Sequence, residues 1–192
     1  HPQNPGIAEL AEACPVPLDV KRPFHIQRWC DTEGIDLVIV GPEAPLAEGV
    51  ADALATDRRL VFGPTRDGAR IEADKAWAKQ LMRSASVPTA DGRTFSELGP
   101  AREHVIARDR PCVVKATGLA AGKGVFVCDD AAEAVAALER ILGEKTFGDA
   151  GARVIVEERL EGQEVSVLAL VDGRTIWVLD PAQDHKQVGE GD

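Results

Sequence analysis

The first third of the chain alternates between short apolar runs and longer amphipathic segments. The continuous runs "IDLVIV" (35–40) and "RLVF" (59–62) are typical of strands buried on both faces of a parallel sheet. "VPLDV" (16–20) is a shorter strand candidate. Between these runs, "PFHIQRWCDTEG" (23–34) and "PLAEGVADALAT" (45–56) have the spacing of helices, and Pro and Gly mark the two ends of the first. Strands and helices in this order predict a parallel, doubly wound α/β domain.

A predicted helix and a linker separate this domain from the rest of the chain. Residues 67–86 predict one long helix. Its apolar face is marked by Ile71, Ala78, Leu81 and Met82. Lys75 lies on that same face, either as a lysine whose amine reaches solvent or as a functional group. We therefore divide the chain into a domain at 1–66 and a second at 67–192, in which "SVPTADGRTF" opens a flap subdomain spanning about 88–158.

The second domain mixes helices with strands that follow one another directly. Its strand candidates are "PCVVKA", "GVFVCD", "ARVIVEE", "QEVSVLALV" and "RTIWVLD". Its helix candidates are "GPAREHVIAR" and "DAAEAVAALERIL", the second with Asp129 or Asp130 as its N-cap. Asp172-Gly173 between two apolar runs is a strong hairpin signal. The second domain is therefore predicted to be α+β, with an antiparallel sheet.

Composition narrows the class of protein and its partners. The chain of 192 residues is 44% hydrophobic and 28% charged, as in ordinary globular proteins, and its net charge is −10. No apolar run approaches the ~20 residues of a membrane span, and no basic patch suggests nucleic acid. The spacing of the cysteines matches neither C-x-x-C nor a zinc site; they are Cys14, Cys30, Cys112 and Cys128. We expect a cytoplasmic monomer with reduced cysteines that acts on small molecules.

The segment "VVKATGLAAGKGV" (113–125) combines a glycine-rich loop with lysines. A P-loop and a dinucleotide-binding turn are both excluded, because the glycine spacing differs and a strand rather than a helix follows. A strand–loop–strand hairpin remains, in which glycines allow close approach to an anion and Lys115 supplies a fixed charge. Such a hairpin would act as a flap over a nucleotide; the alternative is an ordinary flexible hairpin tip.

Other polar residues lie where a nucleotide site would need them. "GPEAPL" follows the strongest apolar run, at the carboxyl edge of the predicted parallel sheet, where open α/β folds bind ligands. The strand "VIVEE" leads into a hinge that can offer backbone groups to an adenine edge, and Glu164 soon after can accept from ribose hydroxyls. The run "DHK" (184–186) follows another strand. Surface charge is the alternative for the glutamates, and a solvated loop or chain end for "DHK".

Taken together, the ordered segments resemble the phosphoribosylamine–glycine ligase family, also called glycinamide ribonucleotide synthetase, of the ATP-grasp superfamily. They span nearly the whole chain and are "VGPEAPLAEG", "FGPT", "DKAWAK", "VVKATGLAAGKGV", "FGDAGARVIVEERLEGQEVSVLALVDG" and "QDHKQVGEGD". In purine biosynthesis this family uses ATP to phosphorylate the glycine carboxylate, and the amine of 5-phosphoribosylamine then attacks the glycyl phosphate. The resemblance implies a ligase that forms a C–N bond, giving glycinamide ribonucleotide, ADP and phosphate, with ATP and Mg²⁺ or Mn²⁺ as cofactors.

The resemblance also implies a role for each matching residue. The ATP phosphates would be contacted by Lys75 and Lys115. The flap would consist of Gly118, Gly122, Lys123 and Gly124. The adenine would be held by Glu157, Glu158 and Leu160, and the ribose by Glu164. The 5-phosphoribosylamine would lie near Gly41, Pro42 and Glu43. The glycine and phosphoryl-transfer region would be faced by the catalytic residues Asp184, His185 and Lys186.

The sequence departs from the family pattern in several places. Thr117 stands where aspartate is expected, Trp77 where phenylalanine is usual and Glu190 where aspartate is common. The family's first strand would precede His1 and its magnesium ligands would follow Asp192, so we expect a fragment without metal ligands that is inactive by itself. The alternatives are another ATP-grasp carboxylate–amine ligase, a carboxylase using bicarbonate, and a non-catalytic nucleotide-binding module.

Overall fold

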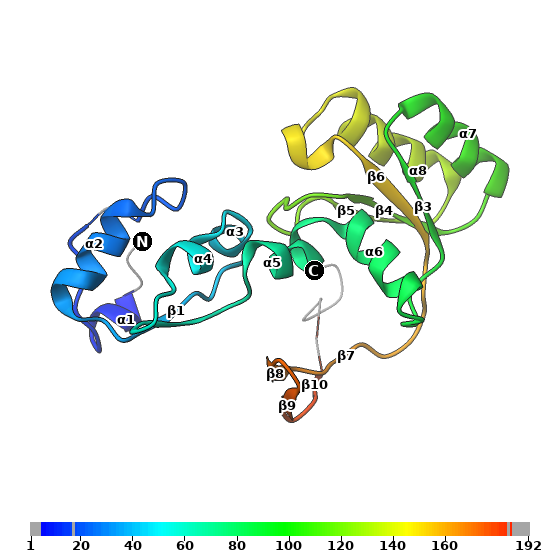
Figure 1. Cartoon of the computed structure of the whole chain (residues 1–192). Coiled ribbons are helices and arrows are strands. Elements are labelled where there is room, and N and C mark those ends of the chain that lie inside the picture. Colours follow the sequence, from blue (N-terminus) through cyan, green and yellow to red (C-terminus); the bar gives the residue numbers. More distant parts are fainter. Residues whose placement is uncertain (1–4, 17, 184, 186–192) are drawn as a thin grey trace. The chain divides into compact units, whose positions relative to one another are not determined.

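The computed structural model describes residues 5–16, 18–183 and 185 (Figure 1). The chain divides into two compact units, the first ending at Arg159 and the second beginning at Leu160. The first unit contains a parallel pair of strands and an antiparallel sheet, each with helices packed on it. Within the described residues, none of the helices has the length and apolar character that a membrane crossing requires.

The N-terminal part of the first unit has a parallel α/β arrangement, as predicted. Strands β1 (Leu37–Ile39) and β2 (Leu60–Phe62) pair in parallel. Helix α2 (Phe24–Glu33) follows Pro23 and ends at Gly34, whose left-handed φ of 64° suits glycine, so both predicted ends are confirmed. The remaining helices here are short: α1 (Pro5–Ala8), α3 (Glu43–Ala47) and α4 (Val50–Leu54).

The two parallel strands are covered on one face. Their inward residues, among them Val38 and Val61, pack against a core supplied by α2 and α4, namely Ile26, Cys30, Val50 and Leu54. The alternate residues are exposed: Leu37, Ile39, Leu60 and Phe62. The prediction that these strands are buried on both faces is therefore wrong for the described chain, because helices pack on one face and successive side chains of a strand point to opposite faces.

Two segments differ from the prediction in their strand content. The described residues within 16–20 form no strand, because the alternate prolines of "CPVPL" lack the N–H groups that a ladder needs. Conversely, the segment predicted as a linker contains strand β3 (Gly92–Phe95), which pairs antiparallel with β6 (Val154–Glu158). The partner of β3 comes much later in the chain, so the local pattern did not reveal the strand.

The helix predicted over 67–86 is two helices, α5 (Arg66–Ala73) and α6 (Lys75–Ser84). Asp74 separates them with an extended backbone, at φ −135° and ψ 92°. Its carboxylate accepts hydrogen bonds from the first free N–H groups of α6, which makes it the N-cap of that helix. The break places Lys75 at the first position of α6 rather than in the middle of a continuous helix.

The antiparallel sheet is the centre of the rest of the first unit. Its strand order is β3–β6–β4–β5, and β4 (Cys112–Ala116) and β5 (Val125–Cys128) form the hairpin that carries the glycine-rich loop. Helices α7 (Leu98–Arg108) and α8 (Ala131–Leu138) pack against each other and on one side of this sheet, whereas α6 lies on the other side (Figure 1).

Successive side chains of these strands point to opposite faces, so that one face of the sheet is apolar and the other carries charged residues. The face toward α7 and α8 is an apolar core that includes Cys112, Val114, Ala116, Val154 and Val156. The opposite face carries Lys115 and Glu157 toward α6. Asp130 is the N-cap of α8, which confirms one of the two predicted N-caps, and α8 continues into a π-helix (Glu139–Gly143). A 3-10 helix (Gly148–Gly151) precedes β6.

The second unit is built from short antiparallel pairs. Strands β8 (Ala169–Asp172) and β9 (Thr175–Val178) form the predicted hairpin, with Gly173 at a left-handed φ of 56° in the turn. Strands β7 (Val165–Ser166) and β10 (Ala182–Gln183) form a second pair. The chain thus has an α/β N-terminal part followed by an α+β part with antiparallel sheets, in the predicted order.

Candidate functional site

A buried carboxylate on β6 lies between two lysines. Glu157 is 6% exposed, and its Oε2 accepts a hydrogen bond from Nζ of Lys115 at 2.7 Å. Its Oε1 lies 2.8 Å from Nζ of Lys79. Lys115 reaches the carboxylate because Val113 of β4 lies opposite Glu157, so that Lys115 stands two residues along on the same face. The three charged side chains therefore come from three different elements, β4, β6 and α6.

The two lysines have different surroundings. The Lys79 amine has two further acceptors, Thr89 Oγ1 at 3.1 Å and the carbonyl oxygen of Ala90 at 2.5 Å. An ammonium has three N–H donors, so the protein itself occupies all of them. The side chain of Lys79 is 7% exposed, whereas that of Lys115 is 29% exposed. Lys79 is thus held within the fold, while Lys115 keeps an open side from which to reach a ligand.

The carboxyl group of Glu157 stays ionised although it is buried. Burial raises its pKa, but the hydrogen bonds and positive charges of Lys115 and Lys79 outweigh burial and hold the pKa below its ordinary value of 4.5. A buried charge is tolerated only when it is paired and hydrogen-bonded, and here each carboxylate oxygen has its own ammonium partner.

A third lysine joins this group from the start of α6. The backbone N–H of Lys75 donates to the carbonyl oxygen of Thr117 at 2.9 Å, and its Nζ donates to that of Gly118 at 3.0 Å. Burial lowers the pKa of Lys75, and the positive charge of Lys115 lowers it further, although the carboxylates of Glu72 and Asp74 offset part of this. Lys75 thus ties α6 to the beginning of the glycine-rich loop, and its charge is one that an added anion would stabilise.

We name these four side chains the lysine cluster: Lys75, Lys79, Lys115 and Glu157. These four side chains carry a net charge of +2, in a protein whose net charge is −10. The carboxylates of Glu72 and Asp74 also act on Lys75, and Asp74 is itself paired with Arg153. The N-terminus of α6 lies beside this cluster, and its first N–H groups already donate to the Asp74 carboxylate and to the Thr117 carbonyl oxygen. The arrangement suits a polyanion such as a di- or triphosphate. The sequence analysis names Lys75 and Lys115 for phosphates and Glu157 for adenine, and it does not name Lys79.

Lys79 was missed although the sequence contains a sign of it. In "DKAWAK" it follows Lys75 by four residues, which places the two on one face of a helix. A buried lysine, however, needs an acid to pair with, and the acid here is Glu157 on a strand far along the chain. Only the folded arrangement of α6 on the sheet brings the two together.

The glycines of the loop have structural reasons for their presence. A Cβ on Gly118 would lie 2.7 Å from Cα of Ala150, and the Gly118 N–H donates to the Ala150 carbonyl oxygen at 2.9 Å. Gly122 has a left-handed φ of 75°, which glycine adopts without strain. A Cβ on Gly124 would crowd the side chain of Ala120 inside the loop. Lys123 is exposed near the loop tip, so the loop is a tight turn that presents a lysine.

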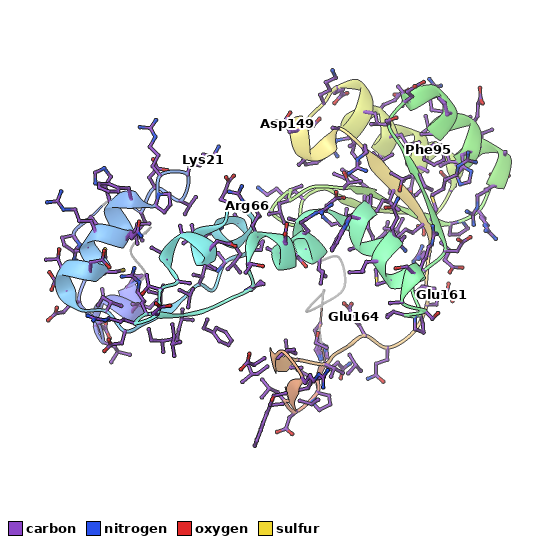
Figure 2. The ribbon with its side chains drawn as sticks, viewed as in Figure 1. Lys21, Arg66, Phe95, Asp149, Glu161 and Glu164 are labelled. Atoms are coloured by element: carbon purple, nitrogen blue, oxygen red, sulfur yellow. The ribbon has the colours of Figure 1, made fainter. Side chains whose placement is uncertain are left out.

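The predicted adenine and ribose residues are divided between the two units. The Oε1 of Glu158 accepts a hydrogen bond from the backbone N–H of Asp91 at 2.7 Å, joining the ends of β6 and β3. Leu160 and Glu164 are exposed residues of the second unit, in which Figure 2 shows Glu164. His185 is exposed. Of the other residues assigned to catalysis, Asp184 and Lys186 lie outside the described residues.

The residues assigned to 5-phosphoribosylamine lie at one end of the parallel strands. Gly41 and Pro42 connect β1 to α3, and Glu43 is the first residue of α3. All three are exposed. Because β1 and β2 are parallel, this connection lies at their carboxyl edge, which is the edge predicted for a ligand. Among residues 5–16, 18–183 and 185, no group of three or more His, Cys, Asp or Glu is arranged to hold a metal ion.

Comparison with known proteins covers the whole chain. Residues 1–72 match the family model "Phosphoribosylglycinamide synthetase, N domain", and residues 73–192 match "Phosphoribosylglycinamide synthetase, ATP-grasp (A) domain". The phosphoribosylamine–glycine ligase of Nostoc sp. is 51% identical over 191 residues, which are 100% of this chain and 45% of that protein. The chain therefore spans less than half the length of this relative.

Solved structures show the same fold. The crystal structure of phosphoribosylamine–glycine ligase from Thermotoga maritima superposes with a TM-score of 0.77 at 27% identity, covering 98% of this chain and 44% of that one. The biotin carboxylase domain of the Hydrogenobacter thermophilus 2-oxoglutarate carboxylase, in complex with MgADP and bicarbonate, has a TM-score of 0.68 at 22% identity, covering 88% of this chain and 39% of that one; it shows the fold alone. The chain belongs to the phosphoribosylglycinamide synthetase family, whose N domain and ATP-grasp domain it matches in that order.

Proposed function

We propose that this chain is the nucleotide-binding part of a ligase that joins glycine to 5-phosphoribosylamine at the expense of ATP. The reaction passes through a glycyl phosphate and gives glycinamide ribonucleotide, ADP and phosphate. Membership of the family supports the reaction, and the lysine cluster is the observation in this chain that carries it. Phosphoryl transfer asks a protein mainly to position its reactants and to neutralise their charge, and an ordered group of lysines supplies both.

The ATP phosphates are assigned to Lys75 and Lys115. Lys115 is half-buried and keeps one side open, and Glu157 remains paired with Lys79 when Lys115 turns to a phosphate. Lys75 carries a charge that burial disfavours, so contact with an anion relieves an existing penalty. The flap then closes over the phosphates with Gly118, Gly122, Lys123 and Gly124.

The other assignments follow the family pattern. We assign adenine binding to Glu157, Glu158 and Leu160, and ribose binding to Glu164. The 5-phosphoribosylamine falls to Gly41, Pro42 and Glu43. The glycine and the transferred phosphoryl group fall to Asp184, His185 and Lys186. Magnesium would supply charge neutralisation of the phosphates. Among the described residues, no group of three or more His, Cys, Asp or Glu is arranged to hold it.

We also propose a monomer that works in the cytoplasm. All four cysteines are free thiols, which suits a reducing compartment. Light scattering on the purified chain measures its mass directly, and a mass of two chains would contradict the monomer.

Nucleotide binding is tested first, by calorimetric titration of the chain with MgATP. Lys115→Ala should weaken binding by about tenfold or more, because it removes a charge-assisted contact worth about 1.5–3 kcal/mol. Lys21→Ala is the matched control, since Lys21 is an exposed lysine before α2 (Figure 2) and its loss changes net charge equally. Equal affinities for the two variants would contradict the assignment of Lys115.

The choice of substrate is tested in a chimera. This chain replaces the equivalent segment of the Nostoc relative, with which it is 51% identical. ADP release that requires both glycine and 5-phosphoribosylamine supports the proposal. ADP release driven by bicarbonate instead favours a carboxylase, and MgATP binding without turnover favours a nucleotide-binding module.

A further inference from the structure

Two cysteines lie opposite each other at the base of the flap hairpin. Cys112 is the first residue of β4, Cys128 is the last of β5, and the antiparallel register pairs them directly. Ala116 donates its N–H to the carbonyl oxygen of the opposite residue, Gly124, at 2.8 Å, so this rung is a hydrogen-bonded pair. Such pairs recur at every second residue of an antiparallel ladder, which makes Cys112–Cys128 another of them.

The backbone spacing of this pair suits a disulfide. Hydrogen-bonded pairs have Cα atoms about 5.5 Å apart, within the range of about 4.4–6.8 Å that disulfides span. Both side chains lie on the face of the sheet that packs against α7 and α8, directly opposite each other in the ladder. The sulfur atoms are therefore already neighbours in the reduced protein, in which both cysteines are free.

We propose that Cys112 and Cys128 form a reversible disulfide when the protein meets a small hydroperoxide such as hydrogen peroxide. The Cys112 thiolate attacks one peroxide oxygen, giving a sulfenic acid and a hydroxide ion that takes up a proton to become water. The Cys128 sulfur then attacks the sulfenic sulfur, and a second water leaves with the Cys128 proton. The two thiols lose two electrons in total, and the peroxide is reduced to two molecules of water.

The pKa values and the burial of the two cysteines indicate that Cys112 attacks the peroxide and Cys128 then attacks Cys112. The neighbouring Cys128 thiol lowers the pKa of Cys112 to about 7, which favours Cys112 as the thiolate that attacks. The same contact raises the pKa of Cys128, which suits the resolving thiol. Cys112 is 7% exposed and Cys128 1%, which favours a small uncharged oxidant over a bulky disulfide. β5 is the edge strand of the sheet, so fraying at its end opens the pair.

The disulfide would covalently join the two strands of the flap hairpin, β4 and β5. Lys115 stands three residues after Cys112 on β4, and the glycine-rich loop joins β4 to β5, so the bond closes the hairpin at its open end. Disulfides in reducing compartments are usually transient and redox-sensing, in keeping with a reversible bond here. The chemical inference does not depend on the reaction that the enzyme catalyses.

The test oxidises the folded full chain with hydrogen peroxide, blocks the remaining thiols with N-ethylmaleimide and maps tryptic peptides by mass spectrometry without reduction. The expected result is that peptides 109–115 and 124–140 are joined, two hydrogens lighter than the separate peptides, and that dithiothreitol separates them. The rate of joining should rise as the pH is raised through about 7, following ionisation of Cys112.

Two variants serve as controls for this test, and one result with the wild-type chain would contradict the proposal. Cys30→Ser should leave the joined peptides unchanged, because Cys30 lies in α2. Cys128→Ser should abolish the joining and leave Cys112 as a sulfenic acid that dimedone traps. If the wild-type peptides stay separate, whether their cysteines are labelled by maleimide or oxidised to sulfinic acid, the sulfurs do not pair and the proposal is wrong. That wild-type outcome decides the matter even where Cys128→Ser does not fold.

Discussion

Lys79→Met separates the structural part of the lysine cluster from the part proposed to meet ATP. The substitution keeps the unbranched stem but removes a buried ammonium with three acceptors, one of them a buried carboxylate. Breaking a buried ion pair by deleting one partner typically costs about 3–5 kcal/mol. Because Glu157 keeps Lys115 on its other oxygen, we expect the lower end, about 3 kcal/mol.

Lys115→Met is the matched comparison on the other side of the same carboxylate. Its side chain is 29% exposed, and Glu157 keeps the buried partner Lys79. Partly exposed pairs contribute less, so we expect a loss of about 1 kcal/mol. The effects on MgATP binding should have the opposite order. Lys115→Met should lose more affinity than Lys79→Met, because of these two lysines it is Lys115 that has a side open to a ligand.

Urea unfolding followed by circular dichroism measures how much stability each variant loses. Calorimetric titration with MgATP measures how much affinity each loses. A double-mutant cycle with Glu157→Gln then isolates the pair, because neutral glutamine removes the charge that Lys79 stabilises. The cost of Lys79→Met should be smaller by about 2 kcal/mol in the Glu157→Gln background. If the cost is the same in both backgrounds, or if Lys115→Met is the more destabilising, Lys79 does not support Glu157 and the reasoning fails.

Three other predictions concern the same region. The pKa of Glu157 is lower in the folded chain than its ordinary value of 4.5, so its contribution to stability is fully present above pH 4.5. That contribution should be lost as acid takes the pH down through the folded-state pKa. Glu157→Gln should therefore flatten the acid side of a plot of urea midpoint against pH. Asp74→Ala should destabilise by about 1–2 kcal/mol, since it removes the N-cap of α6 and the ion pair with Arg153 at 3.0 Å, and an unchanged urea midpoint would contradict this. Glu164→Ala should weaken ATP binding while leaving inorganic triphosphate binding unchanged, and equal losses for both ligands would rule out the ribose role.

Much of the local structure could be read from the sequence because short-range chemistry decides it. Pro23 and Gly34 bound α2, and Asp130 caps α8, through steric limits and hydrogen bonds that involve only neighbouring residues. The Asp172-Gly173 turn sets its hairpin in the same way. The strand–loop–strand form of the flap also followed from its pattern, together with the place of Lys115 on the entering strand.

Tertiary structure decided which of these residues meet. The sequence placed Glu157 at the end of a strand, but it did not show that the carboxylate is held by Lys79 and Lys115 from two other elements. Strand β3 was missed because its partner β6 is distant in the chain. Asp74 caps α6 through nearby N–H groups, but its ion pair with Arg153 forms only in the folded protein. Periodicity fixes which face a side chain takes, but the low dielectric of the packed interior selects the charges that must be paired there, and those pairs form only when the sheet and α6 come together.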